Sequence, residues 1–213
     1  MKKLMLFAAL SVGYLSVINA QDISFGAKAG LNLASVSGDD TSGLDSRLSF
    51  HLGAVAELEI SEKFSIQPEL LYSSQGAKYE DSYTDFGFNI TEKVVAKYDY
   101  LNLPIMAKYY IAEGFSIEAG PQIGVLLKAE ADIDVTVSGQ GVTQSESATE
   151  NLNEFTKGID FGLNFGFGYK LDNGLNFAAR YNLGLSNIND GEGSDEFKNQ
   201  NAVFQISLGY FFK

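Results

Sequence analysis

The sequence predicts an all-β protein: a single-domain, eight-stranded antiparallel up-and-down transmembrane β-barrel with short periplasmic turns and long external loops. Three observations predict this class. Apolar and polar residues alternate with period two in eight separate segments, which is the periodicity of strands. The connections between these segments are alternately short and long. An export-signal pattern precedes the first segment.

Residues 1–20 have the pattern of a signal peptide, which leaves residues 21–213 as one barrel domain. Lys2 and Lys3 form its positive start, Leu4 to Ile18 form an almost unbroken apolar run, and Ala20 is the small residue before a cleavage site. The run is shorter than the roughly 20 residues that cross a bilayer as a helix. Cleavage after Ala20 is therefore predicted, and an uncleaved membrane anchor is the alternative.

The composition of the remaining chain excludes several classes of protein. There is no cysteine, so neither disulfides nor thiolate metal sites stabilise the fold. Without Lys2 and Lys3 the chain has 13 basic and 27 acidic residues, a net charge of −14. This charge argues against a nucleic-acid partner, because phosphate binding needs clustered Lys and Arg. No helix-spanning apolar run follows the signal, so a membrane location requires a closed barrel.

Eight segments carry the alternation: residues 23–33, 47–60, 64–73, 100–109, 115–128, 158–171, 175–186 and 202–212. Each is about as long as the 9–11 residues that a tilted membrane strand needs. In the sixth segment, the clearest, bulky apolar residues alternate with Gly, Asp, Asn and Lys. Pro68, Pro104 and Pro121 each remove a donor from the sheet, and we expect them to mark β-bulges.

The connections predict which end of the barrel lies on which side of the membrane. The short ones are residues 61–63, 112–114 and 172–174, and the last of these is Asp-Asn-Gly, a strong tight-turn signal. The long polar ones are residues 35–46, 74–94, 129–154 and 187–201. Outer-membrane barrels have an even strand number with short periplasmic turns and longer external loops.

The two faces of the strands predict the orientation of the side chains. The apolar face is bulky and almost free of charge, whereas the polar face is rich in Gly and carries charges of both signs. An eight-stranded interior is only just filled by side chains, so large residues outward and small ones inward suit this barrel. The charged residues on the polar face are expected to pair as a structural network in the lumen: Lys28, Glu57, Glu69, Lys108, Glu118, Asp160 and Arg180. Aromatic residues near the strand ends predict interfacial girdles: Phe64, Tyr72, Tyr109, Phe115, Tyr169, Tyr210 and Phe212.

Several segments resemble the PorT-type outer-membrane β-barrel family of Bacteroidota. They include FGAKAGLNLA, YLNLPIMAKYY, DFGLNFGFGYKL and VFQISLGYFFK, and the likeness runs in order from about Phe25 to the C-terminus. The resemblance implies a small barrel in the outer membrane, and most members of the family have no assigned activity. One branch takes part in protein secretion. Lys213 follows Phe212, whereas outer-membrane proteins commonly end in an aromatic residue.

The search for chemistry favours structural roles and predicts no catalytic residue, cofactor or metal site. His51 is the only histidine, so a Ser-His-Asp arrangement would need it as the base. A hydrogen-bonded histidine in the lumen or at its rim is the preferred interpretation. One His without Cys disfavours a transition-metal site. The lumen carboxylates could be paired as acid and base, but charge neutralisation explains them better.

The predicted external loops are acidic. Residues 129–154 contain no Lys or Arg and carry six acids: Glu130, Asp132, Asp134, Glu146, Glu150 and Glu154. Four more acids crowd the last loop: Asp190, Glu192, Asp195 and Glu196. Oxygen ligands at this density could bind a divalent cation such as Ca²⁺, but the spacing matches no EF-hand loop, and solvated surface charge is the preferred interpretation.

The leading hypothesis is a non-enzymatic barrel in outer-membrane lipid, with a structural role or one in binding an envelope or secretion protein through its acidic loops. One alternative is a narrow transport pore or a component of a secretion or assembly system. A membrane-embedded hydrolase or acyltransferase using His51 is less favoured. The weakest alternative is a soluble lipocalin-type barrel with apolar residues inside.

Overall fold

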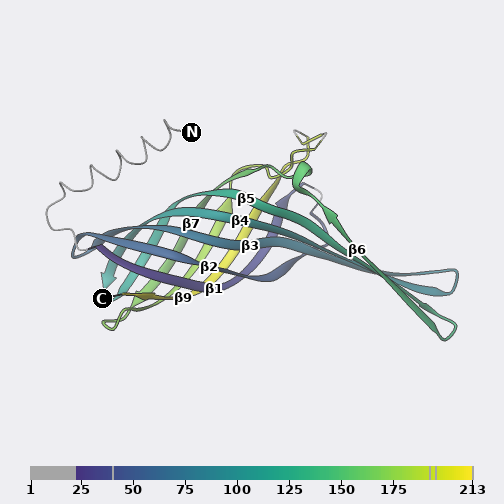
Figure 1. The fold of residues 1–213 in the computed structure, drawn as a ribbon, viewed down its shortest axis with the longest axis horizontal. Coiled ribbons are helices and arrows are strands. Elements are labelled where there is room, and N and C mark those ends of the chain that lie inside the picture. The colour runs from purple at the N-terminus through teal and green to yellow at the C-terminus, as the bar shows by residue number, and fades with distance from the viewer. Residues whose placement is uncertain (1–22, 40, 192, 195, 213) are drawn as a thin grey trace.

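The computed structural model describes residues 23–39, 41–191, 193–194 and 196–212. The predicted signal peptide lies outside these residues, as do Glu192 and Asp195 of the last acidic loop. The part of the chain that the structure describes contains no helix long and apolar enough to cross a membrane. It consists almost entirely of strands (Figure 1).

The strands follow the predicted segments and extend beyond several of them. Their bounds are β1 Ile23–Gly38, β2 Leu44–Ser61, β3 Phe64–Asp85, β4 Phe88–Ala112, β5 Phe115–Gly139, β6 Val142–Asn151, β7 Ile159–Lys170, β8 Leu175–Gly184 and β9 Asn199–Phe211. A short 3-10 helix, Asn153–Phe155, connects β6 to β7.

Eight of these strands close into a barrel. Each pairs antiparallel with its neighbours in the order β1, β2, β3, β4, β5, β7, β8, β9, and β9 pairs back onto β1. β6 pairs only with the outer part of β5 and stands outside this ring. The prediction of an eight-stranded antiparallel up-and-down barrel is confirmed.

The two ends of the barrel differ as the connections predict. Only Glu62 and Lys63 separate β2 from β3, and only Glu113 and Gly114 separate β4 from β5. These turns lie at the end that holds the C-terminus, and the long hairpins project from the opposite end (Figure 1). In outer-membrane barrels the short-turn end is periplasmic.

The side chains have the predicted orientation, with apolar residues outside and polar residues inside. Phe25 is 62% exposed, Ile206 58% and Phe165 49%, whereas Asn32 and Lys108 are fully buried. A water-soluble carrier would have the reverse arrangement, because burial of apolar surface stabilises a protein in water. The lipocalin-type alternative is therefore wrong.

The predicted aromatic residues gather mainly at the short-turn end. Phe64 pairs with Tyr109 across β3 and β4, Phe115 with Tyr169 across β5 and β7, and Tyr210 lies 5.8 Å from Phe212 between ring centroids. Tyr72 lies at the other end of the barrel wall, where its ring centroid is 5.7 Å from that of Phe50. Aromatic rings at this level are typical of a membrane interface.

Two of the predicted long loops are strands, and this corrects the sequence-based expectation. Residues 74–94 form the ends of β3 and β4, which pair without a break up to Asp85 opposite Phe88. Most of residues 129–154 belongs to the β5–β6 hairpin. Because β4 also pairs with β5 out to Asn89 opposite Ser138, the four strands form one continuous sheet beyond the barrel. We call this sheet, residues 77–98 and 129–151, the ribbon (Figure 1).

The strand pattern of the ribbon is hard to recognise in the sequence because one of its faces is polar. Ser, Thr and charged residues alternate there with apolar ones, so the average hydrophobicity is low although the period is two. Its two turns are Phe86-Gly87 and Gln140-Gly141, and all four residues have positive φ. Positive φ at both central residues is the turn type that matches the twist of two-residue hairpins.

The expectation of bulges at the three prolines is wrong. Pro68 lies opposite Ile105, Pro104 opposite Gln122 and Pro121 opposite Leu163, and the register is the same on both sides of each. The register shifts occur elsewhere, for example between Asp99 and Tyr100 of β4. A proline loses one ladder hydrogen bond, but its fixed φ is compatible with an extended strand, so the strand continues through it.

One carboxylate of the ribbon provides a pH-dependent test. The side-chain hydrogen bond from Lys97 is the main reason that the pKa of Asp132 is below its ordinary value of 3.8, and Thr149 donates a second hydrogen bond. The stabilisation from this lowered pKa is complete above the ordinary value and is lost as the pH falls through the lower pKa. NMR titration of the carboxyl carbon is expected to show a midpoint below 3.8, and Lys97→Ala is expected to raise it. An unchanged midpoint in Lys97→Ala would contradict this assignment.

Candidate functional site: the charged lumen

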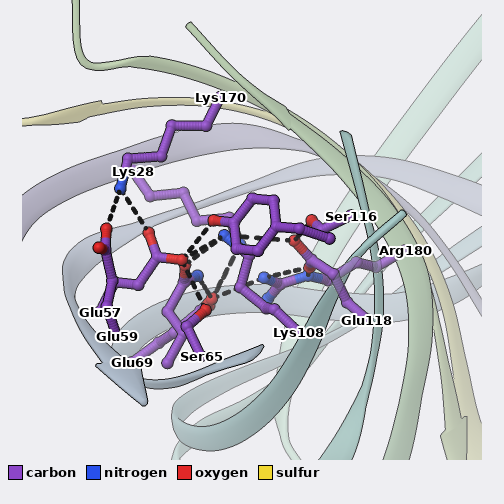
Figure 2. A network of polar contacts seen from close by, with 12 residues as sticks. Lys28, Glu57, Glu59, Ser65, Glu69, Lys108, Ser116, Glu118, Lys170 and Arg180 are labelled. Carbon is purple, nitrogen blue, oxygen red and sulfur yellow. Dashed lines mark hydrogen bonds and ion pairs between the residues drawn. The ribbon is translucent and has the colours of Figure 1, made fainter. Parts of the chain in front are cut away.

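Six of the seven charged residues predicted for the lumen meet in one network near the short-turn end (Figure 2). They come from six different strands, and each lies on the inward-facing side of its own strand. The six are Lys28 of β1, Glu57 of β2, Glu69 of β3, Lys108 of β4, Glu118 of β5 and Arg180 of β8. All are at least nine-tenths buried.

Arg180 is at the centre of one half of the network. Its Nη2 lies 2.7 Å from Glu69 Oε1 and 2.7 Å from Glu118 Oε2, and its Nε donates a hydrogen bond to the same Glu118 oxygen. Lys28 Nζ donates to both oxygens of Glu69, at 3.2 and 3.1 Å. Gln67 also donates to Glu69. A guanidinium between two carboxylates is a strong charge-assisted arrangement.

Lys108 connects this half to the second. Its Nζ lies 3.2 Å from Glu57 Oε1 and 3.7 Å from Glu118 Oε1, and it donates a hydrogen bond to Gln67. Glu57 additionally accepts from Ser65 and from Lys170 at 2.7 and 2.9 Å. Every carboxylate of the network therefore has a cation and at least one further donor.

A glycine on β7 makes the Arg180 contact possible. Gly166 pairs with Glu118 on one side and with Arg180 on the other, so Arg180 must cross it to reach Glu118. A Cβ at Gly166 would lie 2.7 Å from Cγ of Arg180 and 2.3 Å from the carbonyl oxygen of Ala179. The alternating glycines of β7 therefore provide the space that the charged side chains occupy.

Asp160 lies in the lumen but does not join this network. Its carboxylate accepts hydrogen bonds from Ser186 Oγ at 2.6 Å and from Asn201 Nδ2 at 3.0 Å, near the end of the barrel that carries the ribbon. The lumen thus has a charged layer near the short turns and a mainly neutral amide layer beyond it.

The sequence-based set omitted six residues that complete the charged layer: Glu59, Ser65, Gln67, Tyr110, Ser116 and Lys170 (Figure 2). Lys170 pairs with Glu57 and Glu59 where the lumen opens at the short-turn end, and its Nζ lies 4.7 Å from the ring centroid of Phe211. A cavity of about 350 Å³ opens beside it. The polar-face position of Lys170 in the sixth segment was the available signal.

His51 lies in the amide layer, between Asn32 and Ser207. Its Nδ1 is 2.7 Å from Asn32 Oδ1 and its Nε2 is 2.9 Å from Ser207 Oγ. Ser49, its neighbour in sequence on the same face, donates instead to the backbone carbonyl of Ser74. The side-chain amide of Asn32 is oriented by Nδ2, which donates to the carbonyl oxygens of Phe50 and Ser74.

These contacts favour one tautomer of the neutral ring. Asn32 Oδ1 can only accept, so His51 Nδ1 carries the proton and Nε2 accepts from the Ser207 hydroxyl. This order of groups resembles a base-activated nucleophile. The three side chains are nevertheless buried, and a Cβ at Gly30 would lie 2.6 Å from the imidazole, so the ring packs directly on the β1 backbone.

Replacing His51 with Ala is expected to lower the free energy of unfolding by about 1–3 kcal/mol, because Ser207 and Asn32 each lose a buried partner. Urea unfolding in lipid vesicles, followed by heat-modifiable gel mobility, measures this difference. Thr143→Ala on the exposed strand β6 is the control, with an effect near zero. Equal stability of the two variants would contradict a structural role for His51.

Among the described residues no group of three or more His, Cys, Asp or Glu side chains could hold a metal ion. The acids predicted for one external loop are divided between strands, with Glu130, Asp132 and Asp134 on β5 and Glu146 and Glu150 on β6. Solvated surface charge stays the preferred interpretation of these acids, with divalent-cation binding as the alternative.

A closed barrel with an apolar exterior and a charge-compensated interior defines an integral outer-membrane protein. The chain belongs to the outer membrane protein beta-barrel domain family, whose model matches residues 19–190. The match is to this general family, and the PorT-type assignment stays a prediction. No curated protein matches the sequence.

Solved structures of other outer-membrane barrels are similar to the chain at low sequence identity. The attachment invasion locus protein Ail of Yersinia pestis is 14% identical with a TM-score of 0.46, over 89% of this chain and 98% of that one. Neisserial surface protein A is 12% identical with a TM-score of 0.44, over 90% and 100% of the two chains. OprG of Pseudomonas aeruginosa is 13% identical with a TM-score of 0.40, over 90% and 97%.

Proposed function

We propose that this outer-membrane barrel is a non-enzymatic, non-conducting membrane anchor that presents the ribbon to a binding partner outside the outer membrane. The ribbon is the observation that carries the proposal. Four strands continue beyond the barrel as one hydrogen-bonded sheet, which is far more ordered structure than closing a barrel requires. Ordered surface segments on a rigid scaffold are where proteins carry binding functions.

The contents of the lumen support a closed barrel over a transport pore. Arg180 of β8 reaches across the interior to Glu69 of β3, which lies opposite in the ring, whereas Lys28 and Lys108 each pair with a carboxylate two strands away. All of these side chains are buried. Interiors of eight-stranded barrels are filled by side chains. A pore would require the charged layer to separate, which would leave buried charges without partners.

The burial of Ser207 supports a non-enzymatic role. A nucleophile must be reachable by the bond that it attacks, and backbone donors must be free to stabilise an oxyanion. Ser207 is 4% exposed, and it lies within the paired region of β9 between β1 and β8. A part in secretion or assembly is compatible with this proposal, with the secreted or assembling protein as the partner of the ribbon.

Two measurements test the proposal. Planar-bilayer recording of the refolded protein is expected to show no conductance steps. In intact cells, Phe86→Cys at the ribbon tip is expected to react with a membrane-impermeant maleimide and, with a cysteine-linked photo-crosslinker, to give a discrete product. Asn173→Cys in a short turn is the matched control, and it is expected to give neither. Regular conductance, or identical labelling at both positions, would overturn the proposal.

A further inference from the structure

The two faces of the ribbon differ in composition. Alternation along β3 and β4 continues the lumen-facing side of the barrel wall into one face, which we call the inner face, and the lipid-facing side into the other, the outer face. β5 adds its residues to these faces through its pairing with β4 beyond the register shift at Asp99 and Tyr100. Ser73 opposite Tyr100 is a buried inward pair, and the pairs Tyr79–Val94 and Tyr83–Ile90 follow on the same side in the same register. Ile133 and Val137 of β5 lie opposite Val94 and Ile90, so each pair is extended into a row of three side chains across the sheet.

The outer face is a ladder of polar pairs that satisfy one another. Ser82 pairs with Thr91 at 2.9 Å, Thr84 donates to Asn89 at 2.8 Å, and Thr136 pairs with Ser145 at 3.0 Å. Lys97 and Asp132 form an ion pair on the same face. Such a face is suited to permanent contact with water.

Apolar side chains are present on the inner face from its base to its tip. Its main apolar members are Tyr79, Tyr83, Ile90, Val94, Ile133 and Val137. All six are partly or largely exposed, and Tyr83 is 45% exposed. At the base of the ribbon the same face is buried, as Ala77 and Ala129 show. An antiparallel sheet with one apolar and one polar face normally packs its apolar face against another layer, and a contiguous exposed apolar patch marks an interaction site.

Charge is segregated between the faces in the same way. All three lysines of the ribbon, Lys78, Lys93 and Lys97, alternate onto the outer face. The charged residues of the inner face are all acidic: Asp81, Asp85, Glu92, Glu146 and Glu150. Close side-chain contacts confirm the grouping, since Tyr83 donates a hydrogen bond to Glu92 and Asp81 raises the pKa of Tyr79 by its negative charge.

From this segregation we infer that the inner face of the ribbon binds a cationic amphipathic polypeptide segment, whose apolar side chains cover the Tyr and aliphatic rows and whose Lys or Arg side chains pair with the inner-face acids. The inference rests on the proposed function and names the partner's chemistry. Complementary charge arranged around an apolar patch favours encounter and excludes partners of the wrong sign.

The same charges disfavour the other two occupants of such a face. A second copy of the chain would place five acids against five acids with no cation between them, and like charges in an interface oppose association. A bilayer surface rich in anionic lipid would be repelled by the same acids. Only a positively charged partner gains from every inner-face charge.

The absence of cysteine allows the two faces to be distinguished on one strand. Val137→Cys places an environment-sensitive dye on the inner face, and Thr136→Cys places it on the outer face one residue away. The probe is a synthetic amphipathic peptide of alternating Lys and Val, added to the full-length protein in detergent micelles. We expect a saturable blue shift at position 137 and little change at position 136, weakened by added salt because exposed charges are screened.

Charge reversal on matched residues tests the chemistry. Asp81→Lys, on the inner face, is expected to weaken peptide binding about tenfold when combined with Glu92→Lys, because each exposed ion pair is replaced by a repulsion. Glu80→Lys, the neighbouring residue on the outer face, is expected to leave binding within about twofold. If the double variant lost its ribbon, Glu146→Lys on β6 repeats the test from another strand.

Four results would overturn the inference: equal dye responses at both positions, equal binding of a Glu–Val peptide, a response at position 137 to anionic lipid vesicles, or a concentration-dependent response without peptide. The last two would assign the face to a membrane or to a second copy. In any of these cases a surface crosslink at Phe86 would still support the proposed function, so failure of the two proposals can be distinguished.

Discussion

Replacing Arg180 with Ala is expected to lower the free energy of unfolding by about 3–5 kcal/mol, the largest effect of any single substitution considered for this barrel. Arg180 lies 2.7 Å from both Glu69 and Glu118, which are buried. Without the guanidinium, Glu69 and Glu118 lose the cation that they share. Among the described residues, Lys28 is then the only cation beside Glu69, and Lys108 the only one beside Glu118. The destabilisation arises from the uncompensated charge, because the ion pairs themselves only offset their own desolvation.

Urea unfolding in lipid vesicles measures this loss, with gel mobility of unheated samples as the folded fraction. Lys97→Ala, which breaks an exposed ion pair of the ribbon, is the matched control and is expected to cost at most about 1 kcal/mol. Changing Glu118 to Gln together with Arg180→Met is expected to recover most of the stability, since Glu69 keeps Lys28 and Glu57 keeps Lys108 as partners. An Arg180→Ala variant as stable as Lys97→Ala would contradict the role of the charged layer.

Replacing Phe165 with Arg is expected to cost about 2–4 kcal/mol in lipid vesicles, because a charge at the middle of the hydrocarbon must be desolvated. Phe165 lies halfway along β7, faces outward and is 49% exposed. This prediction tests whether the outward apolar surface of the barrel contacts lipid, and it does not depend on the contacts in the lumen.

Two further variants isolate the cause. Phe165→Leu keeps the residue apolar, and we expect a loss below about 1.5 kcal/mol. Val142→Arg places the same charge at the exposed tip of the ribbon, where water solvates it, and is expected to be neutral. If Phe165→Arg and Val142→Arg had the same effect, the outward face would not be in contact with hydrocarbon.

The strand pattern predicted the barrel because period-two alternation is a local property. From Ile159 to Leu171 every second side chain is bulky and apolar, and this order alone specifies two faces. The same alternation places Lys28, Glu69 and Arg180 on the inward side. It failed for residues 74–94 and 129–154, where low hydrophobicity concealed the period.

The contacts within the lumen could not be predicted in the same way. Lys28 and Glu69 are separated by 41 residues, and His51 and Ser207 by 156. These distances in sequence are bridged only when the sheet closes and its register is established. Ser49, two residues before His51 on the same face of β2, bonds instead to the backbone of Ser74.

By itself, the sequence determined the number of barrel strands, the apolar exterior and the presence of both positive and negative side chains inside. These features depend only on spacing along the chain. Only the tertiary structure decided which charges meet, how Gly166 admits Arg180, and that β3 to β6 form one ribbon with an acidic, apolar inner face. Such features depend on strand register, and register is determined by pairing between segments that are distant in the sequence.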